Sequence, residues 1–162
     1  VFLHLINNAR RSVHITTSYL AIDEPMRQAL CSAGDSGVDV RLLLPGIPDH
    51  KFAYLAAQSH YGELLVHRVK IYIYEPGLLH GKTVLSDGEA AFVGSVNMDY
   101  RSFQLHFECG TVLYGVPAIE GLAEDIQRIT DCSRRVTYQE WKSRPWYRKL
   151  LSTLLRLFEM WM

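Results

Sequence analysis

Three apolar runs rich in β-branched residues alternate with two helical patterns in the first half of the chain, and this order constrains the fold most. The runs span residues 12–19, 38–44 and 69–74. Asp23-Glu24-Pro25 predicts the start of one helix, because a carboxylate caps a helix and proline is tolerated in the first turn. Asp49 predicts the cap of a second helix, with one apolar face formed by Phe52, Leu55, Ala56, Leu64 and Leu65. This β-α-β-α-β order predicts an α/β fold with a mixed, mostly parallel β-sheet flanked by helices.

The pattern changes in the second half. Residues 79–85 and 90–94 predict two strands around Asp87-Gly88, a pair typical of tight hairpin turns. Residues 105–113 predict another strand, and residues 117–130 predict a helix with one apolar face. No repeat, low-complexity tract or linker divides the sequence, so we expect a single domain.

The composition is that of one globular domain and argues against a nucleic-acid partner. Of 162 residues, 48% are hydrophobic and 21% are charged. The 17 basic residues balance the 17 acidic ones, so no strong positive field attracts nucleic acid. Three cysteines, Cys31, Cys109 and Cys132, lack metal-ligand spacing and cannot all pair within one chain, which favours reduced thiols in the cytosol.

His80 and Lys82 give the clearest indication of chemistry. Residues two apart in a strand project to the same side, so an imidazole and an ammonium are expected to share one pocket. Gly81 between them leaves room for a bulky group to approach the backbone. A neutral imidazole can attack phosphorus to form a phosphohistidine, and a lysine can neutralise the non-bridging oxygens. The pair therefore suits a phosphodiester substrate, with no metal and no cofactor required.

Four polar residues farther along the chain extend this site. Ser95 and Asn97, near the end of the paired strand, offer a hydroxyl and an amide to the same phosphate oxygens. Glu108 is expected on the next strand, where an inward carboxylate accepts the proton on the other nitrogen of His80, and an outward one is only a surface acid. Asp87 has two interpretations, a direct catalytic role or the ordinary chemistry of an Asp-Gly turn.

The order His80-x-Lys82, Asp87, Gly94-Ser95 and Asn97 resembles the HKD signature of the phospholipase D superfamily. Further segments are similar to the C-terminal half of bacterial cardiolipin synthases: Leu43-Leu44-Pro45-Gly46-x-Pro48-Asp49, Tyr72-x-Tyr74-Glu75-Pro76-Gly77, Asn97-Met98-Asp99-x-Arg101-Ser102-Phe103, Phe107-Glu108 and Trp141-x-x-Arg144-Pro145. An ordered series of this length makes coincidence remote. Gly81 and Tyr100 stand where many relatives have Ala and Pro, but no departure removes a reactive group.

The resemblance implies a phospholipase D-like catalytic half-domain with one HKD motif over residues 1–135, followed by an amphipathic C-terminal segment of the same domain over residues 136–162. It implies these site residues: catalytic His80, Lys82, Asp87, Asn97 and Glu108, and substrate-binding Ser95 and Gly81. A second HKD motif, from an upstream half of the same polypeptide or from a second copy, is expected to place two histidines across one phosphodiester. One histidine then attacks while its counterpart protonates the leaving alcohol.

On this resemblance we expect a phosphatidyltransferase that makes cardiolipin from two phosphatidylglycerols through a phosphatidyl-histidine. The expected partners are a phospholipid and a membrane surface. The expected location is the bacterial inner membrane, with the catalytic domain on the cytoplasmic face. Two alternatives stay open at this point: a homodimeric phosphodiesterase or nuclease of the same superfamily, and a non-catalytic membrane-binding module.

The two ends of the chain carry further expectations. From Trp141 to Met162, arginine and lysine alternate with aromatic and leucine side chains. Such a segment fits either a membrane interface or a helix docked on another part of the parent protein. Helical spacing is already present at Phe2, Leu5 and Ile6, directly after a first residue that is not Met. We therefore expect a fragment, with any membrane anchor located upstream.

Overall fold

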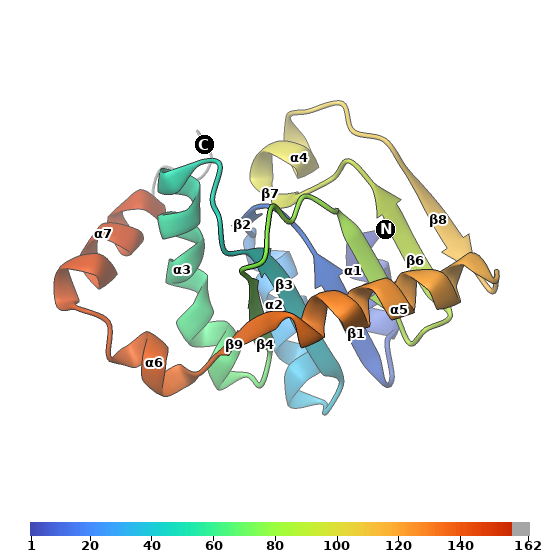
Figure 1. Cartoon of the computed structure of the whole chain (residues 1–162), viewed down its shortest axis with the longest axis horizontal. Helices are drawn as coiled ribbons and strands as arrows, with labels where there is room; N and C mark the ends of the chain where they lie inside the picture. The colour runs from blue at the N-terminus through green and yellow to red at the C-terminus, as the bar shows by residue number, and fades with distance from the viewer. Residues whose placement is uncertain (157–162) are drawn as a thin grey trace.

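The computed structural model describes residues 1–156, and within them a seven-stranded mixed sheet forms the centre of the molecule (Figure 1). The strand order is β8-β6-β5-β1-β3-β4-β9. In chain order the elements are α1 (Phe2–Asn8), β1 (Ser12–Thr16), β2 (Leu20–Ala21), α2 (Glu24–Asp35), β3 (Asp39–Pro45), α3 (Lys51–Val66), β4 (Lys70–Tyr74), β5 (Thr83–Ser86), β6 (Ala90–Gly94), β7 (Met98–Asp99), α4 (Tyr100–Gln104), β8 (Gly110–Tyr114), α5 (Ala118–Asp131), β9 (Ser133–Val136), α6 (Tyr138–Lys142) and α7 (Trp146–Arg156).

The parallel centre of the sheet follows the predicted β-α-β-α-β order. β1 pairs in parallel with β3, and β3 pairs in parallel with β4. The first crossover helix, α2, is capped as expected, since the Asp23 carboxylate accepts a hydrogen bond from the Met26 amide at 3.0 Å. The other pairings within this sheet, β1–β5, β5–β6, β6–β8 and β4–β9, are antiparallel, and β2 and β7 form a separate parallel pair. The predicted α/β class is confirmed, with antiparallel strands at both edges of the sheet.

The second half contains the predicted hairpin, but two strands are shorter than expected. β5 begins at Thr83 rather than Leu79, because its neighbour β1 ends at Thr16, which faces Thr83. β8 begins at Gly110 rather than Leu105. Residues 105–109 form the connection from α4 to β8 instead, with the His106 amide donating to the Arg101 carbonyl at 2.9 Å. The prediction of a strand over residues 105–113 is therefore correct only from Gly110, and the observed strand ends at Tyr114.

Helices cover both faces of the sheet. α1 and α2 lie on one face and α5 lies across the other (Figure 1). The larger apolar cluster joins α1 and α2 to the sheet and includes Ile6, Val13, Leu30 and Ile71, all at most 1% exposed. The smaller cluster lies under α5 and contains Leu43, Leu79, Leu85, Ala91, Ile119 and Ile126. Leu79 belongs to this core, which fixes the chain directly before His80.

The start of α3 differs from the prediction. Its N-cap is His50, whose side chain makes no capping hydrogen bond. The Asp49 carboxylate is instead hydrogen bonded to the Tyr19 hydroxyl and to the His50 amide. Phe52, expected on the apolar face, is 66% exposed, whereas Ala56 and Leu64 are buried as expected. Asp49 therefore connects the loop before α3 to the end of the first parallel strand.

The C-terminal segment packs along α3. The indole nitrogen of Trp141 donates to the Gln58 carbonyl at 3.0 Å, and the Arg144 guanidinium lies 5.1 Å from the centre of that indole ring. α7 continues beside α3 on the same side of the molecule (Figure 1). Leu157, Phe158 and Trp161, which the sequence pattern places in the same amphipathic segment, lie outside the described residues. Within residues 1–156, no helix combines the length and apolar character needed to span a membrane.

Candidate active site

Polar loops converge at one edge of the sheet, the upper edge in Figure 1. The carboxyl ends of β1, β3 and β4 meet here, as they do wherever parallel strands are neighbours. The segment before β5 and the segment after β6 reach the same edge, since the two antiparallel strands run in opposite directions. The loops at this edge hold all the predicted site residues except Asp87.

His80 and Lys82 meet at a hydroxyl that the sequence analysis did not single out. Nδ1 of His80 lies 3.1 Å from the Ser18 Oγ, and Nζ of Lys82 donates to the same Oγ at 3.2 Å. Nζ also donates to the His80 carbonyl at 2.6 Å. The imidazole is exposed, whereas Lys82 is only 9% exposed. The two groups therefore share one position at the edge, with the ring open to solvent and the ammonium behind it.

Burial changes the acidity of Lys82. Desolvation lowers the pKa of its ammonium below the ordinary 10.5, and the negative charges of Asp49, Glu108 and Asp99 partly oppose that shift. These three carboxylates come from the loop before α3, the connection after α4 and strand β7. Lys82 is therefore a partly desolvated cation faced by acidic groups from three separate segments.

Glu108 has different partners from those expected. One carboxylate oxygen accepts from the Ser102 hydroxyl at 3.0 Å, and the other accepts from the Ser95 hydroxyl. His80 makes its hydrogen bond with Ser18, so the predicted Glu108–His80 contact is wrong in this structure. The physical reason is position: Glu108 lies in the connection before β8 rather than on a strand beside His80.

Ser95 and Asn97 belong to the same hydrogen-bond network as Glu108. The Ser95 hydroxyl accepts from the backbone amide of Cys109 at 3.0 Å, and the backbone amide of Asn97 donates to the Ser102 hydroxyl at 3.2 Å. Oδ1 of Asn97 is buried and has no hydrogen-bond partner within residues 1–156. The network therefore fixes the backbone of Asn97, while the Ser95 hydroxyl is engaged by Glu108 instead of facing an open pocket.

Gly94 and Gly81 differ in whether a side chain would fit at their positions. A Cβ added to Gly94 would lie 2.4 Å from the Cys109 carbonyl oxygen, because β6 and the chain before β8 approach each other closely there. A Cβ added to Gly81 would meet only Thr16, at an ordinary 3.5 Å. Gly94 is therefore required by packing, whereas the space beside Gly81 tolerates a methyl group.

Asp87 lies outside the site. It follows β5, at the opposite end of that strand from His80. Its carboxylate accepts from the backbone amides of Arg10, Arg11 and Ser12 at 2.8, 2.7 and 2.8 Å. Burial raises the pKa of this carboxyl, but the three amides outweigh it and lower the pKa below 3.8. Of the two interpretations of Asp87, the structure supports the one in which it holds a turn.

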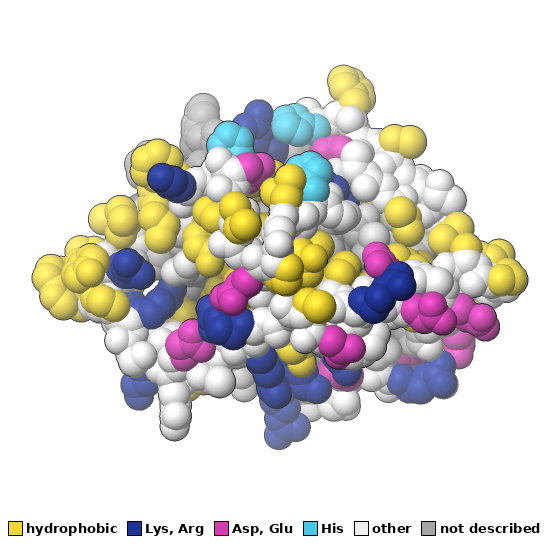
Figure 2. Space-filling model, viewed as in Figure 1, with side chains coloured by type: hydrophobic (Ala, Val, Ile, Leu, Met, Phe, Trp, Pro, Cys, Tyr) yellow, Lys and Arg dark blue, Asp and Glu magenta, His cyan; other side chains and the backbone are white. Residues whose placement is uncertain are grey.

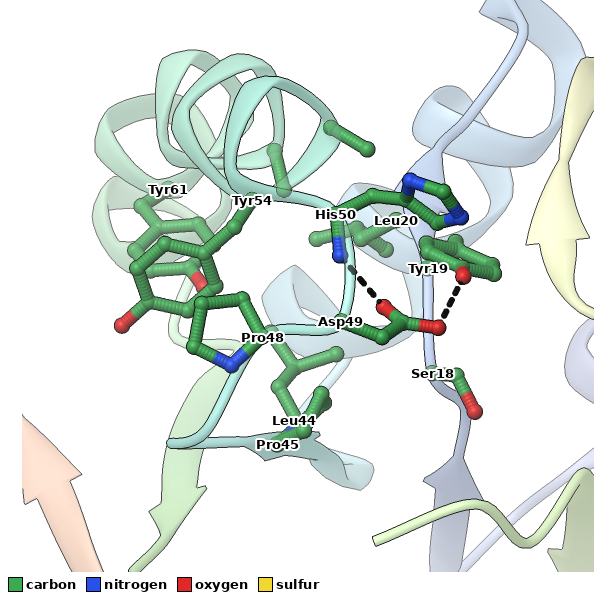
Figure 3. Close-up of a pocket in the computed structure, with 12 residues that line it drawn as sticks. Ser18, Tyr19, Leu20, Leu44, Pro45, Pro48, Asp49, His50, Tyr54 and Tyr61 are labelled. Atoms are coloured by element: carbon green, nitrogen blue, oxygen red, sulfur yellow. Dashed lines mark hydrogen bonds between the residues drawn. The ribbon is translucent and has the colours of Figure 1, made fainter. Parts of the chain in front are cut away.

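A second polar pair lies next to Ser18. Figure 3 shows the Tyr19 hydroxyl pointing at the Asp49 carboxylate, which also accepts from the His50 amide at 2.8 Å. Burial and the bond to Asp49 raise the pKa of the Tyr19 phenol well above its ordinary value. The signal for Ser18 and Tyr19 was present in the sequence, since Thr16-Thr17-Ser18-Tyr19 ends a buried strand with four hydroxyl groups. Residues at the carboxyl ends of parallel strands are where ligands commonly bind.

Comparison with known families identifies the type of domain. Residues 2–130 match the family model described as "Cardiolipin synthase, PLD-like domain". The chain belongs to this family. It is 38% identical over 156 residues to a cardiolipin synthase of Clostridium perfringens (strain SM101 / Type A), covering 96% of this chain and 33% of that protein. It is 37% identical over 156 residues to the major cardiolipin synthase of Bacillus subtilis (strain 168), covering 96% of this chain and 32% of that protein. This cardiolipin synthase PLD-like domain thus spans about a third of the length of these relatives.

Solved structures share the fold of this PLD-like domain. Nuc, a phospholipase D family member from Salmonella typhimurium, is 20% identical with a TM-score of 0.73, covering 84% of this chain and 88% of that chain. A phosphatidylserine synthase from Haemophilus influenzae Rd KW20 is 16% identical with a TM-score of 0.77, covering 100% of this chain and 44% of that chain. At these identities the likeness concerns the fold alone, and it confirms the phospholipase D-like class.

Proposed function

We propose that this chain carries one half of the active site of a phosphatidyltransferase that makes cardiolipin from two phosphatidylglycerols. The observation that carries the proposal is the junction at Ser18, where the imidazole of His80 and the ammonium of Lys82 meet at one hydroxyl. A nucleophile and a cation held together at an open edge suit a phosphodiester. The identity to two named cardiolipin synthases supports the choice of substrates.

The bonds of Ser18 support a nucleophilic form of His80. A hydroxyl offers one donor and two acceptor positions. The Ser18 Oγ donates to the Leu79 carbonyl at 3.5 Å and accepts from Lys82. In the tautomer that we propose, Nδ1–H of His80 donates to the Ser18 Oγ and the lone pair stays on Nε2. Ser18 thereby takes the orienting role that the sequence pattern gave to Glu108.

The proposed reaction has two displacement steps. Nε2 of His80, or of its counterpart in a second motif, attacks the donor phosphorus, so an N–P bond forms and the P–O bond to the glycerol headgroup breaks. The opposite histidine gives the leaving glycerol its proton. It then removes a proton from a hydroxyl of the second phosphatidylglycerol, whose oxygen forms the new P–O bond as the N–P bond breaks. Two phosphatidylglycerols give one cardiolipin and one glycerol.

The other site residues are proposed to bind or to position. Lys82 and Asn97 bind non-bridging phosphate oxygens, because an ammonium and an amide nitrogen both donate hydrogen bonds. Glu108 and Ser95 hold the loop that carries Asn97 and act through it. Gly81 leaves the backbone between His80 and Lys82 accessible to the phosphate. We therefore reassign Glu108 and Ser95 from contact with substrate to support of Asn97.

Two partners belong to the proposal. The first is a second HKD motif, from an upstream half of the same polypeptide or from a second copy, because the exposed His80 faces no second histidine with a matching lysine within residues 1–156. The second partner is the membrane surface. We place the protein at the bacterial inner membrane, with this domain on the cytoplasmic side, where three free cysteines stay reduced.

The outer face of α7 is the proposed membrane contact. Its inner face packs on α3, yet Trp146, Leu150 and Leu154 are 75%, 53% and 49% exposed. Figure 2 shows hydrophobic side chains gathered over α7 at the left, with lysine and arginine among them. Aromatic and leucine side chains enter the interface while Arg148 and Lys149 meet anionic headgroups. Such a contact brings the domain to its substrates.

Substitution of His80 tests the function directly. The full-length protein is incubated with vesicles of labelled phosphatidylglycerol, and cardiolipin is measured beside a His80→Asn variant and a His67→Asn control. His67 is a histidine at the far end of α3 from the site. We expect His80→Asn to lower the rate by at least about a thousandfold, as removal of a nucleophile or its acid partner does. Undiminished product from His80→Asn would overturn the proposal.

The same preparation separates the alternatives. Cleavage of plasmid DNA by a symmetric dimer, without cardiolipin, would favour the phosphodiesterase. Binding to vesicles with neither product nor phosphohistidine would favour the non-catalytic module. The phosphatidyltransferase predicts cardiolipin and an intact plasmid, because the chain has no excess of positive charge to hold DNA.

A further inference from the structure

We propose that a cavity lined by Asn97 of the proposed site binds the phosphate of the lipid that accepts the phosphatidyl group, and that Lys51 and Arg101 are its cations. This inference rests on the proposed function and deepens it, because it concerns the second substrate of the same site. It explains how a transferase can favour a lipid alcohol over small alcohols and water.

The cavity has a volume of about 360 Å³ and is open to solvent. It lies between β2, the start of α3, the strand β7 and the helix α4. Pockets of roughly 300–1,000 Å³ hold drug-sized ligands, so this one accommodates a phosphoglycerol headgroup. The volume is far larger than a water-binding void requires.

The cavity adjoins the proposed reaction centre through two chain segments. Tyr19, which lines it, directly follows Ser18, whose hydroxyl contacts His80 and Lys82. Asn97 lines it from the other side, and the amide of the next residue, Met98, donates to the Thr17 hydroxyl at 2.9 Å. The cavity is therefore lined by Asn97 of the proposed site and by Tyr19, the neighbour of Ser18 in the chain.

The charges in the cavity favour an anion. Lys51 lines it from the first turn of α3 and Arg101 from α4, and His50 and His106 are also lining residues. The one carboxylate among the lining residues is Asp99, and it accepts from the Ser102 amide at 2.6 Å as the cap of α4. Lys51, Arg101 and two imidazoles therefore line the cavity together with a single carboxylate, which caps α4.

The spacing between the reacting hydroxyl and the phosphate of the acceptor lipid suits a separate phosphate site. In phosphatidylglycerol, the hydroxyl that reacts is separated from the lipid's own phosphate by the three carbons of glycerol. In the proposed complex that hydroxyl lies at His80 and the phosphate lies in the cavity. The cavity also has an apolar wall formed by Leu20, Phe52, Ala53 and Ala56, against which the glyceride part of the lipid can pack.

Competition between two acceptors tests the subsite. The full-length protein receives phosphatidylglycerol vesicles together with deuterated glycerol, so that one phosphatidyl-enzyme divides between cardiolipin and deuterated phosphatidylglycerol. Mass spectrometry gives the ratio of the two products. This ratio does not depend on the amount of folded enzyme, so a variant that folds poorly still reports on the subsite.

We expect Lys51→Gln and Arg101→Gln each to lower the ratio of cardiolipin to deuterated phosphatidylglycerol by about tenfold, as loss of one charge-assisted hydrogen bond does. Arg101→Lys and Lys51→Arg, which keep the charge, should restore much of it. Arg128→Gln on α5 serves as the matched control, because that exposed arginine pairs with Asp125 on the opposite side of the sheet.

Two results overturn the inference, and they differ. An unchanged ratio in both glutamine variants means that Lys51 and Arg101 do not bind the acceptor phosphate, and the proposed function stands. Absence of both products from the wild-type protein means that no phosphatidyl group is transferred, and the proposed function fails together with the subsite.

Discussion

Ser18 is the residue on which the proposed chemistry depends most closely after His80 and Lys82. Its hydroxyl is the common partner of Nδ1 of His80 and Nζ of Lys82. It lies directly after the buried pair Thr16 and Thr17 at the end of β1, so the strand fixes its position. A short side chain two residues beyond a buried strand has little freedom of its own and can hold an imidazole in one orientation.

Ser18→Ala tests this positioning. The variant loses the acceptor for Nδ1–H and one partner of Lys82, so we expect kcat to fall about tenfold, with the KM for donor lipid little changed. Ser32→Ala on the exposed side of α2 is the matched control. Steady-state transfer rates at several donor concentrations separate the two constants. A rise in KM at constant kcat would show that Ser18 binds substrate rather than positioning the histidine.

The buried ammonium predicts an alkaline limit to activity. Desolvation lowers the pKa of Lys82 below 10.5, so its positive charge is lost as pH rises through that lowered value. We expect kcat/KM to decline on the alkaline side at a pH below 10.5. In Lys82→Arg the guanidinium stays charged, so the activity that remains should lack this decline. The same decline in both proteins would assign it to another group.

Among the helices and strands, those with a clear hydrophobic periodicity were predicted correctly from the sequence. β1, α2, β3 and β4 were predictable because buried strands and an Asp-Pro helix start have short-range signals. The connection at residues 105–109 was not, since Phe107 and Cys109 favour a strand by composition, yet both are exposed and have no strand beside them. Glu108 was misassigned for the same reason: its partners, Ser95 and Ser102, come from segments brought together only by folding.

An ion cluster at the opposite end of the parallel strands stabilises the sheet. Asp39 on β3 bonds Arg41 at 2.6 Å and Lys70 on β4 at 2.7 Å, and His14 on β1 lies 3.8 Å away. Burial alone raises the pKa of Asp39, but its bonds to Arg41 and Lys70 outweigh burial and lower the pKa from 3.8 to about 2. The cluster connects three neighbouring strands within their first three residues.

Asp39→Asn should therefore destabilise the fold in a pH-dependent manner. The folded pKa lies below the unfolded one, so the stabilisation is fully present above pH 3.8 and is lost as pH falls toward 2. Near pH 7 we expect the free energy of unfolding to drop by about 1–2 kcal/mol, after allowance for partial exposure. Urea unfolding followed by circular dichroism should show the difference narrowing in acid. A constant difference from neutral to acid pH would contradict the assignment.

For the molecule as a whole, the site lies at an edge and not in an enclosed pocket. His80 is exposed, and the chain spans about a third of the relatives that it matches. α7 extends along α3 toward the same edge of the molecule (Figure 1). An open edge flanked by an amphipathic helix is suited to a second motif on one side and a lipid surface on the other.

Removal of apolar groups from α7 tests the membrane contact. We expect Trp146→Ser combined with Leu150→Ser to weaken binding of the full-length protein to anionic vesicles by more than about tenfold, since each side chain gains from burial in the interface. Val112→Ser on β8, an equally exposed apolar position, is the control. Sedimentation with vesicles measures the bound fraction, and added salt should weaken it. Equal binding by both variants would place α7 against another part of the protein.

The most direct test of the central claim is a crystal structure of the full-length protein with vanadate, which imitates a phosphate under attack. We expect vanadate at the edge, with Nε2 of His80 and Nζ of Lys82 both within about 3 Å of the anion and Ser18 still in contact with the two side chains. Vanadate bound elsewhere, or a His80 ring whose Nε2 faces the protein while the anion contacts other residues, would contradict it.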